Sequence, residues 1–150
     1  MLGELSKKEI EEVLRSNVVG RIGCSSGQKI YVVPVAYAYD GESIIGHTTE
    51  GMKIEFLREN PECCFQVDDV MDLSDWISVI AWGRFEELKG DEARKAGDFL
   101  MNRIAPEMPG ETSQSHRMGP LPATRQATFA RNPIIYRIRL KEKSGRFEKP

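Results

Sequence analysis

The chain has 150 residues and a formal net charge of −2 at pH 7, with 40% hydrophobic and 29% charged residues. We therefore expect residues 1–150 to form a single globular domain. The sequence contains neither a basic block nor an apolar run of about 18 residues, which argues against nucleic-acid and membrane partners. The N-terminal residues contain no apolar signal core, so we expect a cytoplasmic protein.

The first half of the chain predicts short helices and strands. Ser6-Lys7-Lys8-Glu9 is a capping-box pattern, and it predicts an amphipathic helix over residues 6–16. Strands are expected over 18–24 and 29–39. The pair Asp40-Gly41 favours a hairpin that returns along 43–47. A short helix follows over 51–60, since Pro61 ends it.

The second half predicts strands over 63–68, 76–88 and 133–143. An acidic turn joins the first two, and a helix begins at Gly90. Residues 105–132 form an irregular loop. The fold class is thus mainly β with accessory helices: a six-stranded antiparallel barrel.

Two of these strands, over 30–39 and 76–82, are apolar on both faces. A barrel strand needs only one apolar face for its own core. We expect the accessory helices to cover part of the second face and a partner subunit or a flat ligand to cover the rest. Six strands leave no lumen, so a sizeable ligand must bind outside the barrel, in a cleft against a second copy.

The segment HTTEGMK at 47–53 is the strongest candidate site. It joins a strand to a helix N-terminus, whose N–H groups and dipole suit an anion. The hydroxyls of Thr48 and Thr49 and the ammonium of Lys53 would complete a cradle for one phosphate. The alternative is a plain threonine cap and a solvated lysine.

Three further residues carry possible chemistry. Pro34 removes one ladder donor, which either frees neighbouring backbone groups for a ligand or protects an edge strand. His47 is either a structural hydrogen-bonding group or a proton donor and acceptor near neutral pH. Ser78 is polar in an apolar strand and needs a partner, either a backbone carbonyl or a ligand.

No metal site is expected from the sequence. The three cysteines, Cys24, Cys63 and Cys64, lack metal-ligand spacing. They are expected to be reduced thiols, with the adjacent pair on opposite faces of a strand. The only other histidine, His116, lies in the irregular loop.

Five blocks occur together in an order typical of a known family: VGRIG at 19–23, YVVPVAY at 31–37, IIGHTTEGMK at 44–53, LRENP at 57–61 and SVIAWGR at 78–84. The chain resembles FMN-binding split-barrel proteins of the pyridoxamine 5′-phosphate oxidase-like superfamily, and within it the nitroimidazole-resistance branch.

The resemblance implies a split β-barrel that forms a homodimer, with FMN at the subunit interface. It assigns the phosphate to Thr48, Thr49, Met52 and Lys53, and the flavin ring to backbone groups of Val33, Pro34, Val35 and Ala36. Ser78 stands where family members place a polar flavin contact. His47 matches a histidine linked to activity in the nitroimidazole-resistance proteins.

The implied activity is that of an FMN-dependent oxidoreductase. It would pass electrons from a reduced nicotinamide, NADH or NADPH, to a small acceptor such as a nitro compound or quinone. The alternatives are a non-catalytic flavin-binding protein for storage or sensing, a pyridoxamine-phosphate-oxidase-like oxidase, and a protein that binds another planar cofactor. In one hypothesis Arg117, Arg125 and Arg131 of the irregular loop reach the flavin or phosphate of the partner subunit, and in the alternative this loop is a mobile or surface-wrapping tail.

Overall fold

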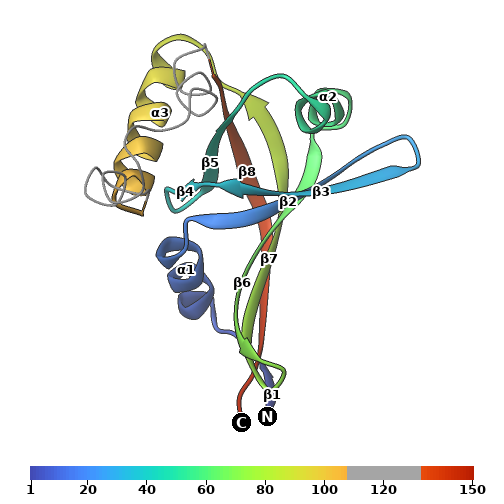
Figure 1. The fold of residues 1–150 in the computed structure, drawn as a ribbon, viewed down its shortest axis with the longest axis vertical. Helices are drawn as coiled ribbons and strands as arrows, with labels where there is room; N and C mark the ends of the chain where they lie inside the picture. Colours follow the sequence, from blue (N-terminus) through green and yellow to red (C-terminus); the bar gives the residue numbers. More distant parts are fainter. Residues whose placement is uncertain (108–132) are drawn as a thin grey trace, which may run out of the picture.

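The computed structural model describes residues 1–107 and 133–150 (Figure 1). Its strands are β1 (Leu2–Glu4), β2 (Val19–Ser26), β3 (Lys29–Ala36), β4 (Ala38–Tyr39), β5 (Ser43–Thr48), β6 (Glu62–Asp72), β7 (Asp75–Glu87) and β8 (Ile134–Glu148). Its helices are α1 (Lys7–Ser16), α2 (Met52–Glu59) and α3 (Gly90–Ile104), the last followed by a 3-10 turn at Ala105–Glu107.

The strands form one antiparallel sheet in the order β3-β2-β6-β7-β8-β5-β4, with β1 added beside β8. The sheet curls but does not close, so β3 and β4 lie at its two ends. This is the split-barrel architecture that the family resemblance implies. The described part of the chain has eight strands rather than six, because β1 was not predicted and the strand expected over 29–39 is divided.

That division occurs at Tyr37 and not at Pro34. The register of β2 and β3 runs unbroken from Val19 opposite Ala36 to Ser26 opposite Lys29, and Pro34 faces Arg21 within it. Tyr37 instead donates its N–H to the carbonyl of Val18 (2.9 Å), and the chain then passes into β4. Proline is accepted at position 34 because β3 is an edge strand, where one row of backbone groups has no strand partner.

The β6–β7 hairpin is longer than expected. Its pairing runs from Glu62 opposite Arg84 to Asp72 opposite Asp75, so most of the acidic turn lies within β6. With β8 and β1 it forms an arm that reaches away from the barrel to the two termini (Figure 1). The ends of β7 and β8 are extended by pairing between strands that are far apart in the sequence. A local sequence pattern does not predict such pairing.

The predicted local signals are confirmed at α1 and at the β4–β5 turn. The Ser6 hydroxyl accepts the N–H of Glu9 (3.2 Å), and the Glu9 carboxylate accepts the N–H of Ser6 (2.9 Å). At the turn, Gly41 adopts a φ of 100°. This left-handed conformation suits glycine.

The main hydrophobic core fills the inner face of the sheet beneath α1 and α2. A second, smaller cluster packs α3 against the opposite face of β4 and β5: Ala38, Ile45, Leu100 and Ile104. The expected helix cover of the outer apolar face is thus present over β4 and β5. None of the helices in the described ranges is long and apolar enough to cross a membrane.

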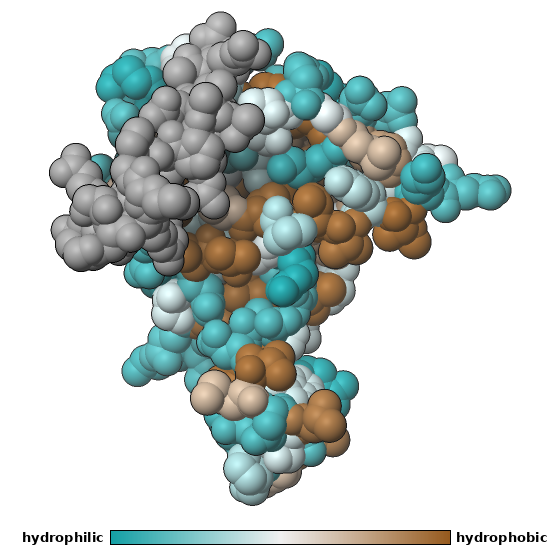
Figure 2. Space-filling view, in the orientation of Figure 1, coloured by the Kyte–Doolittle hydropathy of each residue, from teal (hydrophilic) through white to brown (hydrophobic). Residues whose placement is uncertain are grey.

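Another part of the outer face remains uncovered. Ile30 and Val32 of β3 are 78% and 61% exposed, and Trp82 of β7 is 40% exposed. Figure 2 shows apolar side chains across the middle of the visible face and again at the lower end of the arm. The sheet therefore positions two features, the open edge at β3 and an apolar outer surface beside it.

Candidate flavin-binding site

The phosphate segment connects β5 to α2. Thr48 is the last residue of β5, and the N-cap of α2 is Gly51, which supplies no side-chain cap. The Thr48 hydroxyl donates to the Thr49 carbonyl (3.1 Å) and does not cap the helix. The plain threonine cap is therefore wrong, and no side chain of residues 1–107 or 133–150 makes a capping hydrogen bond at the N-terminus of α2.

Lys53 lies in the first turn of α2 and is half-buried. Burial lowers its pKa below the ordinary lysine value, and the nearby Cys24 opposes this shift only in part. Among residues 1–107 and 133–150, Lys53 has neither an ion pair nor a hydrogen-bond partner. A partly desolvated cation at an uncapped helix N-terminus favours an anionic ligand. Met52 precedes it with its side chain 47% exposed.

The edge strand β3 runs beside α2. Tyr31 of β3 contacts Phe56 of α2 edge-to-face, with ring centroids 5.9 Å apart. Val35 is buried and Val33 packs against the core, whereas Pro34 points outward. Residues Val33 to Ala36 thus continue the open edge of the sheet beyond the Tyr31 contact, and Ala36 packs against the α3 cluster.

His47 lies on the other face of β5, towards α3. Strand alternation places its side chain with that of Ile45, which packs against α3. His47 is opposite Ile135 of β8, and Ile135 approaches Gly97 of α3. Burial, and secondarily the charge of Lys53, lowers the pKa of His47 below its ordinary value near 6.5. His47 is therefore a neutral imidazole at pH 7.

Gly46 lies against the ring of Tyr136, its partner on β8. The space beside this glycine is therefore filled by a side chain of the protein.

Ser78 does not lie in the phosphate segment or on β3. It is half-exposed on the outer face of β7, where its hydroxyl accepts from Gln66 Nε2 (3.1 Å). The same Gln66 nitrogen donates to Asp68 (2.9 Å), and Arg21 approaches both residues. Among the described residues, the partner of Ser78 is thus a side-chain amide and not the backbone carbonyl that the sequence offered. Its contact with a ligand stays a prediction.

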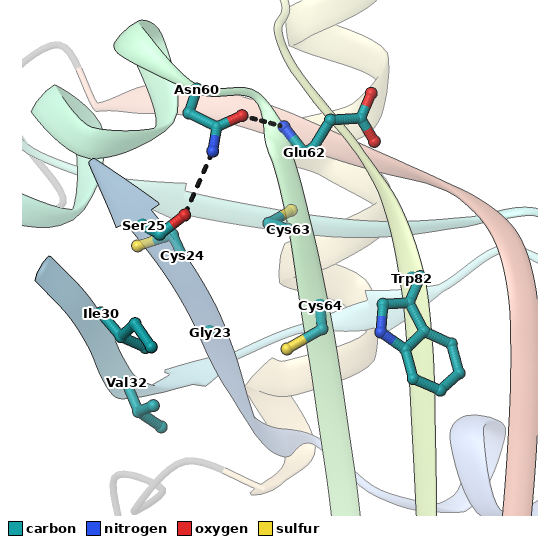
Figure 3. Close-up of a pocket in the computed structure, with 10 residues that line it drawn as sticks. All are labelled: Gly23, Cys24, Ser25, Ile30, Val32, Asn60, Glu62, Cys63, Cys64 and Trp82. Carbon is teal, nitrogen blue, oxygen red and sulfur yellow. Dashed lines mark hydrogen bonds between the residues drawn. The ribbon is translucent and has the colours of Figure 1, made fainter. Parts of the chain in front are cut away.

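A shallow pocket of about 450 Å³ opens on the uncovered outer face (Figure 3). The Trp82 ring lies beside Cys64, and Ile30 and Val32 of β3 flank Gly23. Cys63 points into the core, where burial raises its pKa to about 12, whereas Cys64 is half-exposed in the pocket. The adjacent cysteines therefore point to opposite faces, as predicted.

A family model described as pyridoxamine 5′-phosphate oxidase matches residues 6–147. The chain belongs to the pyridoxamine 5′-phosphate oxidase-like family. The resemblance to the pyridoxamine 5′-phosphate oxidase-like superfamily, stated from the five sequence blocks, is confirmed by this match.

Solved structures support the family fold. A FAD-binding protein from Mesorhizobium loti is 27% identical, with a TM-score of 0.79 over 100% of this chain and 98% of that one. A 5-nitroimidazole antibiotic resistance protein from Bacteroides thetaiotaomicron is 19% identical, with a TM-score of 0.71 over 98% of this chain and 87% of that one. The second likeness supports the fold alone.

An uncharacterized protein of Rhizobium meliloti is 30% identical over 84 residues, which are 56% of each chain. The match therefore spans about half the length of that curated relative.

One network of ion pairs beside the phosphate segment was not predicted. Arg58 of α2 contacts Glu50, in the phosphate segment, and Glu87, at the end of β7. Glu50 and Arg58 are eight residues apart, with a loop and a helix start between them. No periodicity of a single element brings such a pair together, so the sequence pattern gave no signal.

Two sets of expectations remain to be placed. Arg117, Arg125, Arg131 and His116 lie outside the described residues. Within residues 1–107 and 133–150, no three histidine, cysteine or acidic side chains are grouped in a way that would hold a metal ion.

Proposed function

We propose that this chain binds a flavin, as FMN, at the N-terminus of α2 and works as a flavin-dependent oxidoreductase. The observation that carries the proposal is Lys53, a half-buried cation without an anionic partner in the described structure, beside an uncapped helix N-terminus. A phosphate monoester is the anion that such a site suits. The Mesorhizobium loti protein is named as FAD-binding, and FAD contains the same riboflavin phosphate.

The residues of the chain have distinct roles in this proposal. Lys53, the hydroxyls of Thr48 and Thr49 and the N–H groups that begin with Met52 hold the phosphate. The open backbone edge over Val33, Pro34, Val35 and Ala36 offers donors and acceptors to the ring, except at Pro34, which has no N–H. When bound, the flavin would supply two-electron chemistry between a reduced nicotinamide and a small acceptor.

His47 is proposed to contact the substrate or to carry a proton. Because it is neutral at pH 7, its imidazole can accept a proton or share one through a hydrogen bond, but it is a weak reservoir of protons. A weak proton reservoir supports a second candidate function, that of a non-catalytic flavin carrier, which needs no proton donor.

We further propose a homodimer across the uncovered outer face. A pocket that exposes Ile30, Val32 and Trp82 resembles the apolar centre of an interface. Ser78 lies on this same face and not beside Lys53, so it would reach a flavin only from the second copy. The free thiols of Cys24, Cys63 and Cys64 fit a reducing compartment such as the cytoplasm.

The test is a visible absorption spectrum of the purified protein, followed by titration with FMN, FAD and riboflavin. A yellow protein that releases FMN on denaturation, or a colourless one that binds added FMN tightly, supports the proposal. A colourless protein that binds none of the three overturns it. Turnover with NADH or NADPH and a nitro compound, a quinone or pyridoxamine 5′-phosphate then separates the oxidoreductase from the carrier.

A further inference from the structure

An acidic residue stands within the anion-binding segment. Glu50 lies between Thr49 and Gly51, the N-cap of α2. A free carboxylate there would repel a phosphate and weaken the positive end of the helix dipole. The structure shows how this charge is held.

Arg58 donates two parallel hydrogen bonds to the Glu50 carboxylate. The distances are 2.8 Å from Nη1 to Oε2 and 3.0 Å from Nη2 to Oε1. Arg58 sits in the last turn of α2, and helical side chains lean towards the helix N-terminus, so the guanidinium extends back along the helix. The Glu50 carboxylate is thereby drawn along the flank of α2.

A third donor of Arg58 anchors this pair to the sheet. Its Nε donates to the Glu87 carboxylate at the end of β7, and this hydrogen bond lowers the pKa of Glu87. One guanidinium therefore connects the anion-binding loop, the helix and the sheet.

We propose that Arg58 is a positioning residue for the anion-binding loop. It neutralises Glu50 and holds that carboxylate away from the phosphate, so that Lys53 and the helix N-terminus present a net positive site. The inference rests on the proposed flavin binding and assigns to that site an internal counter-ion that controls its selectivity for phosphorylated ligands.

The test compares FMN with riboflavin, which lacks the phosphate. In R58M we expect the Kd for FMN to rise about tenfold, since a charge-assisted bidentate pair is lost and Glu50 is released. Riboflavin binding should change less than twofold. The double variant R58M/E50Q should return the FMN Kd to within about threefold of wild type, because no released charge remains.

R94M is the matched control, since Arg94 also lies on a helix and pairs with two carboxylates, Asp91 and Asp98. It should leave both affinities unchanged. An unchanged FMN Kd in R58M overturns the inference. If R58M weakens riboflavin binding as much as FMN binding, Arg58 has only a structural role, and the inference is overturned as well. If the double variant R58M/E50Q binds FMN as weakly as R58M, Arg58 does not act through Glu50.

A second readout does not need a ligand. Amide hydrogen exchange over residues 49–53 should be faster in R58M than in wild type or R94M. If the wild-type protein binds no flavin, the proposed function fails. Unchanged amide exchange in R58M overturns the positioning role of Arg58, whether or not flavin binds.

Discussion

The hydroxyl of Tyr136 lies against Gly46, its partner across β5 and β8. A Cβ atom at Gly46 would lie 2.3 Å from this hydroxyl oxygen and 2.4 Å from the ring carbon that carries it. The Tyr136 side chain is fully buried, and its hydroxyl has no hydrogen-bond partner among the described residues. Burial raises the pKa of this phenol, so it stays protonated.

This arrangement predicts opposite effects for two substitutions. Y136F should raise the free energy of unfolding by about 1 kcal/mol, because it removes a buried hydroxyl without a partner. G46A should lower it by about 2–3 kcal/mol through overpacking. Urea denaturation measures both. A loss of stability in Y136F would show that the hydroxyl has a partner that stabilises the fold.

Stability should depend on His47 between pH 7.5 and 5.5. Because the folded pKa lies below the unfolded value, the unfolded chain binds the proton more readily as the pH falls. The free energy of unfolding should therefore decrease as the pH drops through about 6.5. The carboxylates with lowered pKa values, such as Glu86 and Glu87, lose their contribution only at lower pH.

In H47Q this decrease should be shallower. Denaturation of wild type and H47Q at matched pH values isolates the histidine. Parallel curves would mean that His47 titrates alike in the folded and unfolded chains.

The outer face should hold two copies together. W82E places a charge in the apolar pocket and should convert a dimer to a monomer in multi-angle light scattering. Phe99 of α3 is similarly exposed, at 42%, and lies away from the pocket, so F99E is the matched control. A monomeric wild-type protein, or a W82E variant that remains dimeric, would contradict this interface.

Local chemistry explains which parts of the fold could be predicted. The capping box at Ser6 and the turn at Asp40-Gly41 depend on neighbours within a few residues, and both were predicted correctly. The end of β8 at Glu148 depends on pairing with β7 and β1, which no local pattern contains. Strand β3 ends before Tyr37 for the same reason, since Val18 supplies the decisive hydrogen bond.

The site divides in the same way. The contiguous segment from Thr48 to Lys53 could be predicted as a site because its hydroxyls, helix start and lysine follow one another in sequence. The ion pair of Arg58 with Glu50 and the hydrogen bond between Gln66 and Ser78 could not be predicted, because each joins side chains from different elements. The fold alone brings these residues together.

Met52 offers a gain-of-function test. Its exposed side chain belongs to the first residue of α2, immediately before Lys53. M52R should tighten FMN binding severalfold by adding a second cation near the phosphate. It should also lower stability by about 0.3–1 kcal/mol, because a positive charge opposes the helix dipole. Isothermal titration with FMN checks the gain, and an unchanged Kd would place the phosphate elsewhere.

The central claim is that Lys53 and the N-terminus of α2 hold the phosphate of a flavin. Its most direct test is the Kd for FMN and for riboflavin in wild type, in K53M and in K29M, whose lysine is exposed at the start of β3. We predict that K53M weakens FMN binding by about 10–100-fold, as expected for the loss of a charged hydrogen bond. Riboflavin binding in K53M and both affinities in K29M should stay at wild-type values. An FMN affinity in K53M equal to that of wild type would contradict the account.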